Sequence, residues 1–180
     1  MNEKCSHVYS PGDGSCMVVV DHATVHASMN DLHIEATGVQ NFWQFWQFWK
    51  SHYSFPVTVT SSQKGQEHYT ILFNYFYSAL RILHDCTGEP VLLKQNFLKG
   101  WSFYTEKSTK IGEMEYAILK GDWQLLDCCH NTTILFRLLK RSVPAISYQA
   151  TNIQPFDIRL LIGLMALELI NSLGFYDSPG

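Results

Sequence analysis

The end of the sequence carries the pattern that most restricts how this chain can fold. Residues 156–173 are largely helix-forming, and they begin after Pro155 and end at Gly174, which predicts a helix. The middle of this segment, LLIGLMAL at 160–167, is apolar around the whole helical circumference, as in a helix that is enclosed on every side. The run is too short to cross a bilayer unaided, because a spanning helix needs about 18 or more apolar residues. The rest of the chain is therefore expected to surround this helix.

Glu168 interrupts the apolar helix, and a carboxylate is costly to bury without a partner. We expect it to lie near the point where the helix leaves the core, or to meet Arg159. Nine residues separate the two positions, so they do not share a helix face. The role that we expect for Glu168 is structural and not catalytic.

The residues before the helix contain short stretches that alternate between apolar and polar side chains or are rich in β-branched residues. They recur at intervals of about ten residues between turn sequences such as Thr87-Gly88-Glu89-Pro90, which is typical of a meander that closes into a barrel or sandwich. The segment 69–83 fits either one helix or two strands. The predicted strands are 16–20, 32–36, 55–60, 91–93, 101–105, 111–119, 123–127 and 133–139.

Together these patterns predict a β-rich (α+β) fold, an antiparallel β-barrel-like meander around a buried hydrophobic C-terminal helix. The chain of 180 residues suits one domain. We expect residues 1–15, which are rich in turn-forming residues, to be a flexible N-terminal arm and residues 16–177 to form the domain.

Composition and charge exclude several classes of protein. The chain is 46% hydrophobic and 16% charged, so it has enough apolar material to fold. Its net charge of −3 gives no cationic surplus for nucleic acid. Five irregularly spaced cysteines and a start without a charged and hydrophobic leader predict a cytoplasmic, reduced protein.

Four stretches together resemble the tubby C-terminal-like superfamily, in particular its phospholipid scramblase and LURP-one-related branch. Three of them look like that family's repeated unit of strand, glycine turn and strand, and the fourth is similar to the scramblase ending. The resemblance covers roughly residues 65–177, and it implies a barrel of about twelve strands around a buried C-terminal helix, with no enzymatic active site and work at membranes or on phosphoinositide lipids. The four stretches are ALRILHDCTGEPVLLKQ (79–95), SFYTEKSTKIGEMEY (102–116), DWQLLDCCHNTTILFRL (122–138) and NIQPFDIRLLIGLMALELINSLGFYD (152–177).

Cationic residues at predicted strand ends and turns are the candidate lipid-binding residues. If the meander closes, several of them crowd one rim, where arginine gives forked contacts to phosphate and lysine gives point charge. Acids such as Glu113 and Glu115 lie among them, so a solvated surface of mixed charge is the alternative. The candidates are Lys94, Lys99, Lys110, Lys120, Arg137, Lys140 and Arg141.

The segment FWQFWQFWK (42–50) is a second candidate for contact with lipid. As a strand it has no apolar face, whereas a helix places Gln44, Gln47 and Ser51 together and the six rings on the remaining arc. Such a helix can lie in a membrane interface or pack against the domain. We favour packing, because Lys50 is the only cation nearby. The rings belong to Phe42, Trp43, Phe45, Trp46, Phe48 and Trp49.

Two other constellations suggest chemistry that we do not expect. SPGDGSC (10–16) resembles the Asp-Gly-x-Cys nucleophile box of ovarian-tumour-type deubiquitinating proteases, with Cys16 as the nucleophile and His68 in the partner motif, but no amphipathic helix follows it. The soft ligands of 128–130, with His84 and Cys86, lack the Cys-x-x-Cys spacing of zinc sites. We therefore expect no catalytic residues, no metal and no cofactor.

The predicted function is that of a non-enzymatic protein associated with membrane lipid, either scramblase-like or a phosphoinositide-binding module. The expected partner is anionic phospholipid or a membrane surface, and the expected location is cytoplasmic, with peripheral membrane attachment. Two alternatives remain at this point: a cytosolic protein-interaction module of the same fold, and a cysteine protease-like enzyme that uses Cys16.

Overall fold

The computed structural model describes most of the chain. The described residues are 7–9, 15–21, 24–29, 32–37, 52–62, 64–74, 79–96, 100–117, 122–142, 145–152 and 154–172. The aromatic segment 42–50, and with it all six of its rings, lies outside them.

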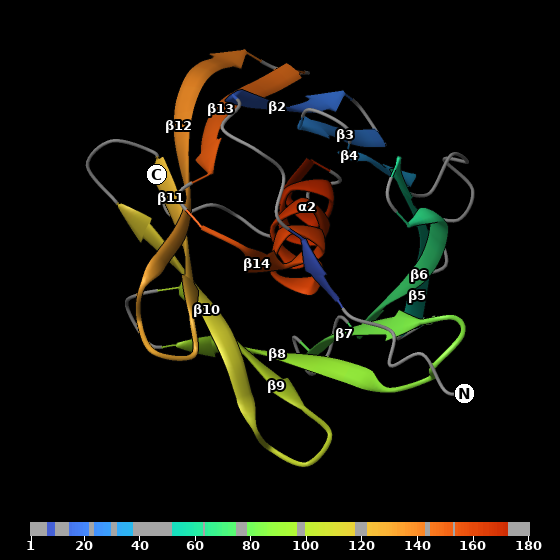
Figure 1. The fold of residues 1–180 in the computed structure, drawn as a ribbon. Coiled ribbons are helices and arrows are strands. Elements are labelled where there is room, and N and C mark those ends of the chain that lie inside the picture. The colour runs from blue at the N-terminus through green and yellow to red at the C-terminus, as the bar shows by residue number, and fades with distance from the viewer. Residues whose placement is uncertain are drawn as a thin grey trace.

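Twelve of the described strands form one antiparallel sheet that winds around the molecule. Each strand pairs with the strands before and after it in the chain, and the last also pairs with the first, so the sheet is a closed barrel (Figure 1). The strands are β2 (Ser15–Asp21), β3 (Thr24–Met29), β4 (Leu32–Thr37), β5 (His52–Ser61), β6 (Gly65–Asn74), β7 (Ala79–His84), β8 (Pro90–Asn96), β9 (Gly100–Thr105), β10 (Lys110–Ala117), β11 (Asp122–Asp127), β12 (Thr132–Ser142) and β13 (Ala145–Asn152).

The predicted C-terminal helix is α2 (Ile158–Ser172), and it lies inside the ring of strands. Every residue from 160 to 168 is buried, which is the arrangement that the apolar circumference requires. A β-rich antiparallel domain that ends in one hydrophobic helix is therefore confirmed. No helix among the described residues has both the length and the apolar character needed to cross a membrane.

The strands alternate as the barrel requires. In β3 and β4 every second side chain is buried, among them Val25, Ala27, Ile34 and Ala36, because successive strand residues point to opposite faces of a sheet. The buried set faces α2 and the other set faces solvent. Functional side chains in the strands are thus found on the outer face or at the two ends of the barrel.

Two glycines lie where α2 and the surrounding strands pack tightly. A Cβ atom at Gly163 of α2 would lie 2.2 Å from Cε1 of Phe103, and one at Gly112 of β10 would lie 2.8 Å from Cδ1 of Leu160. At these two positions the side chains of Phe103 and Leu160 occupy the space that a Cβ atom would need.

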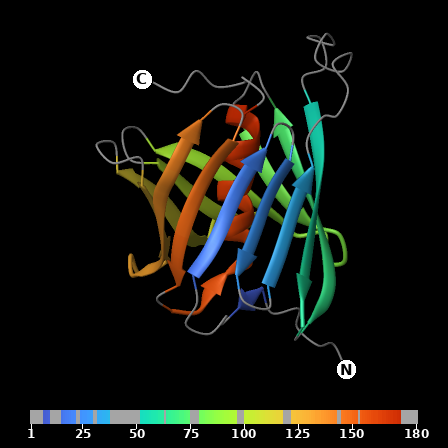
Figure 2. The ribbon, with the colours of Figure 1, turned by 90° about the horizontal axis from the view of Figure 1, so that it is seen from above.

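The two ends of the barrel differ. At the end where α2 begins, which we call the entry end, β1 (Val8–Tyr9) pairs with β14 (Phe156–Asp157). The helix runs from there through the barrel to the opposite end, which we call the exit end (Figure 2). Val8 and Tyr9 belong to the predicted flexible arm, yet they form a strand.

Three further predictions are corrected or sharpened by the structure. The ambiguous segment 69–83 supplies two strands, β6 and β7. β3 and β13 were not predicted. Glu168 is buried, with 2% of its surface exposed, and Arg159 pairs with Asp157 instead of Glu168.

Candidate functional site

The predicted cationic residues do not all gather on one rim. Lys110 lies at the entry end of β10, where its Nζ donates to Oε2 of Glu113 at 2.8 Å, whereas Lys140 and Arg141 belong to the exit end of β12. Lys94 is exposed on β8 with its Nζ 5.1 Å from the ring centroid of Tyr104. The side chains of Lys140 and Arg141, and all of Lys99 and Lys120, lie outside the described set.

Arg137 lies in an apolar setting that the sequence analysis did not single out. It is exposed on the outer face of β12, between Leu135 and Leu139, which are 44% and 51% exposed. Across the ladder it pairs with Gln149 of β13, which pairs in turn with Met17 of β2, a residue that is 53% exposed. We call these five residues the β12 strip: Met17, Leu135, Arg137, Leu139 and Gln149.

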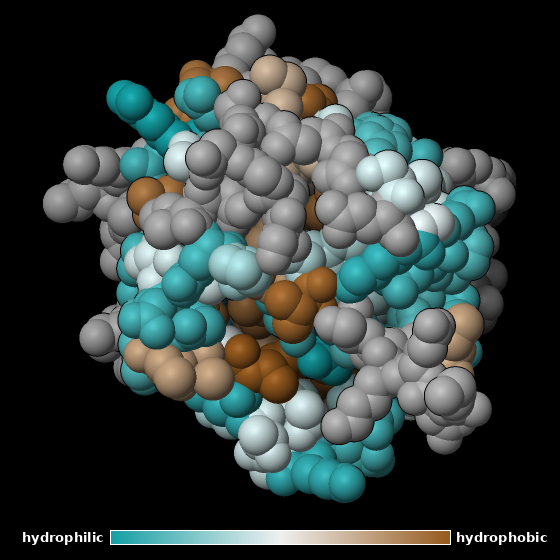
Figure 3. Space-filling view, in the orientation of Figure 1, coloured by the Kyte–Doolittle hydropathy of each residue, from teal (hydrophilic) through white to brown (hydrophobic). Residues whose placement is uncertain are grey.

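The entry end holds a cluster of polar and titratable side chains that attaches β1 to the barrel. The hydroxyl of Tyr9 donates to Oε2 of Glu67 at 2.7 Å, and Nζ of Lys64 donates to the carbonyl of Val8 at 2.8 Å. Tyr69 also donates to Glu67, at 3.3 Å. Figure 3 shows this end, where hydrophilic residues surround a smaller hydrophobic area near the centre of the view.

Two histidines pack inside this cluster. The ring of His7 lies 5.2 Å from that of His84, which in turn lies 4.7 Å from the ring of Tyr69. His84 is 3% exposed, and its Nε2 has no hydrogen-bond partner among the described residues. Burial, followed by the charge of Arg159, lowers the pKa of His7 below its ordinary value of 6.5. Protonation of His7 is therefore disfavoured while β1 is docked.

This shift predicts that the folded state loses stability in mild acid. The pKa of His7 is lower in the folded protein than in the unfolded chain, so below about pH 6.5 the unfolded chain binds more protons and folding becomes less favourable. We expect the free energy of unfolding, measured with urea, to fall between pH 7 and pH 5.5. Its slope against pH should correspond to the uptake of at most one proton. His7→Gln should flatten this part of the profile, whereas His68→Gln, which changes an exposed histidine of β6, should leave it unchanged. A parental slope in the His7→Gln variant would contradict the assignment.

A second group of charged residues lies at the turn between β11 and β12. His130 contacts Oε1 of Glu113, whose Oε2 accepts the hydrogen bond from Lys110. Partial burial acts to raise the pKa of Glu113, but the hydrogen bond and charge of Lys110, together with His130, lower it below 4.5. These contacts favour the charged form of a largely buried carboxylate.

The cysteines and the histidine considered as zinc ligands do not form one site among the described residues. Cys86, Cys128 and Cys129 are exposed free thiols, and the two adjacent sulfur atoms lie 3.9 Å apart. The hydrogen bond with Cys128 and the charges beside it raise the pKa of Cys129, so its thiol is less reactive at neutral pH. His84 of the proposed zinc set is buried at the entry end, and no group of three metal-ligating atoms forms around these cysteines among the described residues.

Cys16 does not have the structural surroundings that the resemblance to a cysteine protease predicts. Cys16 lies within β2, where its backbone pairs with Met29 and Ala150, and not at the start of a helix. His68 is exposed on the outer face of β6 while Tyr69 is buried. The two halves of the resemblance therefore lie in separate strands of the sheet.

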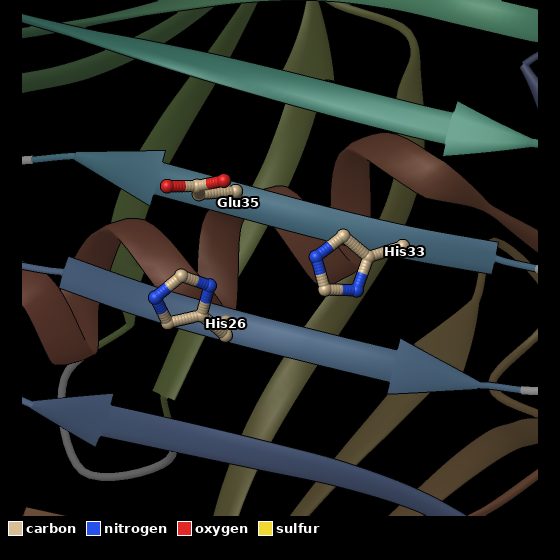
Figure 4. Close-up of side chains that lie close together, drawn as sticks. All are labelled: His26, His33 and Glu35. Atoms are coloured by element: carbon tan, nitrogen blue, oxygen red, sulfur yellow. The ribbon is translucent and has the colours of Figure 1, made fainter.

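The outer face of β3 and β4 brings together two histidines and a glutamate. His26 of β3 lies directly across the ladder from Glu35 of β4, and His33 precedes Glu35 by two positions on the same face. One ligand atom from each residue lies within 4.8 Å of the others, and the two rings are stacked with an angle of 29° between their planes. Figure 4 shows the three side chains on these neighbouring strands. The sequence did not predict this group, because His26 and Glu35 are nine positions apart.

Comparison with known proteins adds no relative. No family model, no curated protein and no solved structure matches this chain.

Proposed function

We propose that this protein is a non-enzymatic binding domain of the tubby C-terminal-like kind that attaches to anionic membrane lipid through the β12 strip. The exposed Arg137 between the exposed Leu135 and Leu139 is the observation that carries this proposal. Twelve antiparallel strands around an enclosed C-terminal helix support the proposed kinship, because that is the architecture that the resemblance implies.

The filled interior directs binding to the outside of the barrel. Helix residues 160–168 are all buried against the inward side chains of the strands. A ligand that entered the barrel would have to displace this helix, and the lost apolar burial would cost about 1.5 to 3 kcal/mol for each large side chain. Binding at the outer face carries no such cost.

The β12 strip combines the two interactions that hold a protein at a lipid surface. Leu135, Leu139 and Met17 are each about half exposed. Each of these side chains gains about 1 kcal/mol when it is inserted into the boundary between lipid headgroups and acyl chains. Arg137 can form forked contacts with lipid phosphate, and a cation near an anionic surface contributes about 1 kcal/mol. The sum of about 4 kcal/mol corresponds to weak, reversible attachment.

Co-sedimentation with liposomes tests the proposal. We expect binding at low salt to vesicles that contain phosphatidylserine or a phosphoinositide, and little binding to phosphatidylcholine alone, because salt screens the cationic contribution. Arg137→Gln should weaken binding about fivefold, the loss of about 1 kcal/mol. Leu135→Ser combined with Leu139→Ser should weaken it at least as much.

Arg81→Gln is the matched control. Arg81 is an exposed arginine of β7, outside the strip, so its removal should change binding less than about twofold. Absence of binding to anionic vesicles at low salt, or equal losses in the Arg81 and Arg137 variants, would refute attachment through the β12 strip.

A further inference from the structure

We propose that His26, His33 and Glu35 bind one divalent transition-metal ion of the zinc type on the outer face of β3 and β4. This site is independent of the β12 strip and of lipid attachment. It rests on the register of two adjacent strands and on the ligand chemistry of the three side chains.

Strand register places the three ligands on one surface. His26 and Glu35 are a directly opposed pair, and His33 lies opposite Ser28, two positions along the same face. β3 also pairs with β2, and β4 also pairs with β5. Both backbones are therefore fixed on two sides, and the Cβ atoms of the ligands have set positions.

The distances require only a small adjustment of the side chains. The three ligand atoms lie within 4.8 Å of one another, whereas ligand atoms about 2.1 Å from a tetrahedral zinc are separated by roughly 3.4 Å. His33 and Glu35 are exposed and His26 is partly so, so rotation about their side-chain bonds can close the gap of about 1.4 Å without moving the strands.

Two imidazoles and one carboxylate select the class of metal. Zinc accepts nitrogen and oxygen ligands in this combination, while calcium and magnesium prefer a full set of oxygen ligands. Copper(II) and nickel(II) would also bind imidazole. The fourth position faces solvent and can be filled by water or by a donor from another molecule.

The residues paired with the three ligands on the adjacent strands carry no positive charge that would repel a metal ion. Val19 lies opposite His26 on the β2 side, while Thr58 and Thr60 lie opposite Glu35 and His33 on the β5 side. None of these side chains carries a charge, so a dipositive ion meets no cationic neighbour across either ladder. The carboxylate of Glu35 is the charged group within the triad, and it favours binding.

Titration with zinc after removal of metal by a chelator tests the site. The measurements should use the Cys128→Ser/Cys129→Ser variant, because exposed adjacent thiols would compete for zinc. We expect one ion per chain in isothermal titration calorimetry, together with a rise in thermal unfolding temperature when zinc is added. In the same background, His33→Ala and Glu35→Gln should each weaken zinc binding at least about tenfold and abolish the thermal shift. Without zinc, their unfolding temperatures should match that of the parent.

His68→Ala is the matched control for the metal site. His68 is an exposed histidine on the same outer face, and it lies opposite Thr58 of β5, so its loss should leave zinc affinity within about twofold of the parent. Absence of binding would overturn the proposal. So would weak uptake reduced to the same extent by every histidine substitution, which would indicate an adventitious ion only.

Discussion

Gly163→Ala is expected to lower the free energy of unfolding by up to about 3 kcal/mol, the upper end of the usual cost of overpacking a core. The added Cβ would lie 2.2 Å from Cε1 and 2.5 Å from Cζ of Phe103, and 3.2 Å from Cδ2 of Leu93. Phe103 has no exposed surface, so its ring cannot turn aside into solvent. Alanine is the better helix former by about 1 kcal/mol, and on an exposed helix the same substitution would stabilise the protein.

Phe103→Leu provides the test of this explanation. Removing the ring opens space beside Gly163, so the double variant Gly163→Ala/Phe103→Leu should be less destabilised than the sum of the two single variants. The coupling, measured by urea unfolding at pH 7, should amount to at least about 1 kcal/mol for side chains in direct contact. A Gly163→Ala protein as stable as the parent would show that α2 does not pack against β9 as described.

Tyr148→Phe should destabilise the protein by about 2 kcal/mol, because it removes a hydrogen bond from a buried carboxylate. The hydroxyl of Tyr148, on β13, donates to Oε1 of Glu168, on α2, at 2.8 Å. Tyr148 has no exposed surface and Glu168 has 2%, so water cannot replace the lost donor without a rearrangement of the core. The bond joins the helix to the strand that completes the sheet.

Replacing both partners separates this interaction from loss of packing. Tyr148→Phe and Glu168→Leu, made singly and together, should show a coupling of at least about 1 kcal/mol in urea unfolding, because the two side chains are in direct contact. Tyr104→Phe serves as the control, since Tyr104 is only partly buried. The role assigned to Tyr148 fails if its substitution changes the unfolding free energy no more than the control does.

The sequence was sufficient for the helix and for most of the strands. An apolar run with no polar face indicates enclosure whatever encloses it, so α2 could be predicted without knowledge of the sheet. Two strands of the barrel were missed, β3 and β13. β13 carries a usable signal, because Ile146 and Tyr148 alternate with Ser147 and Gln149.

The candidate sites depended on information that no local pattern contains. His26 and Glu35 are nine residues apart and become neighbours only through the register of the β3 and β4 hairpin. Arg137 was a candidate on charge, but its apolar neighbours on the outer face emerge only when the two faces of β12 are assigned. Glu168 was expected near the point where the helix leaves the core, but it is buried and has a partner 20 residues away on another element. Pairwise contacts of this kind are set by tertiary structure.

The enclosed helix also constrains the order of events during folding. A completed ring of hydrogen-bonded strands would not admit α2, so the helix must dock on an open, curved sheet before the last pair of strands joins. The pairing of β13 with β2 brings together residues 145–152 and 15–21, and contacts between such distant parts of a chain form slowly. Until they form, both strands present unpaired edges on which other chains can add. During synthesis, therefore, this chain remains vulnerable to aggregation until α2 has left the ribosome.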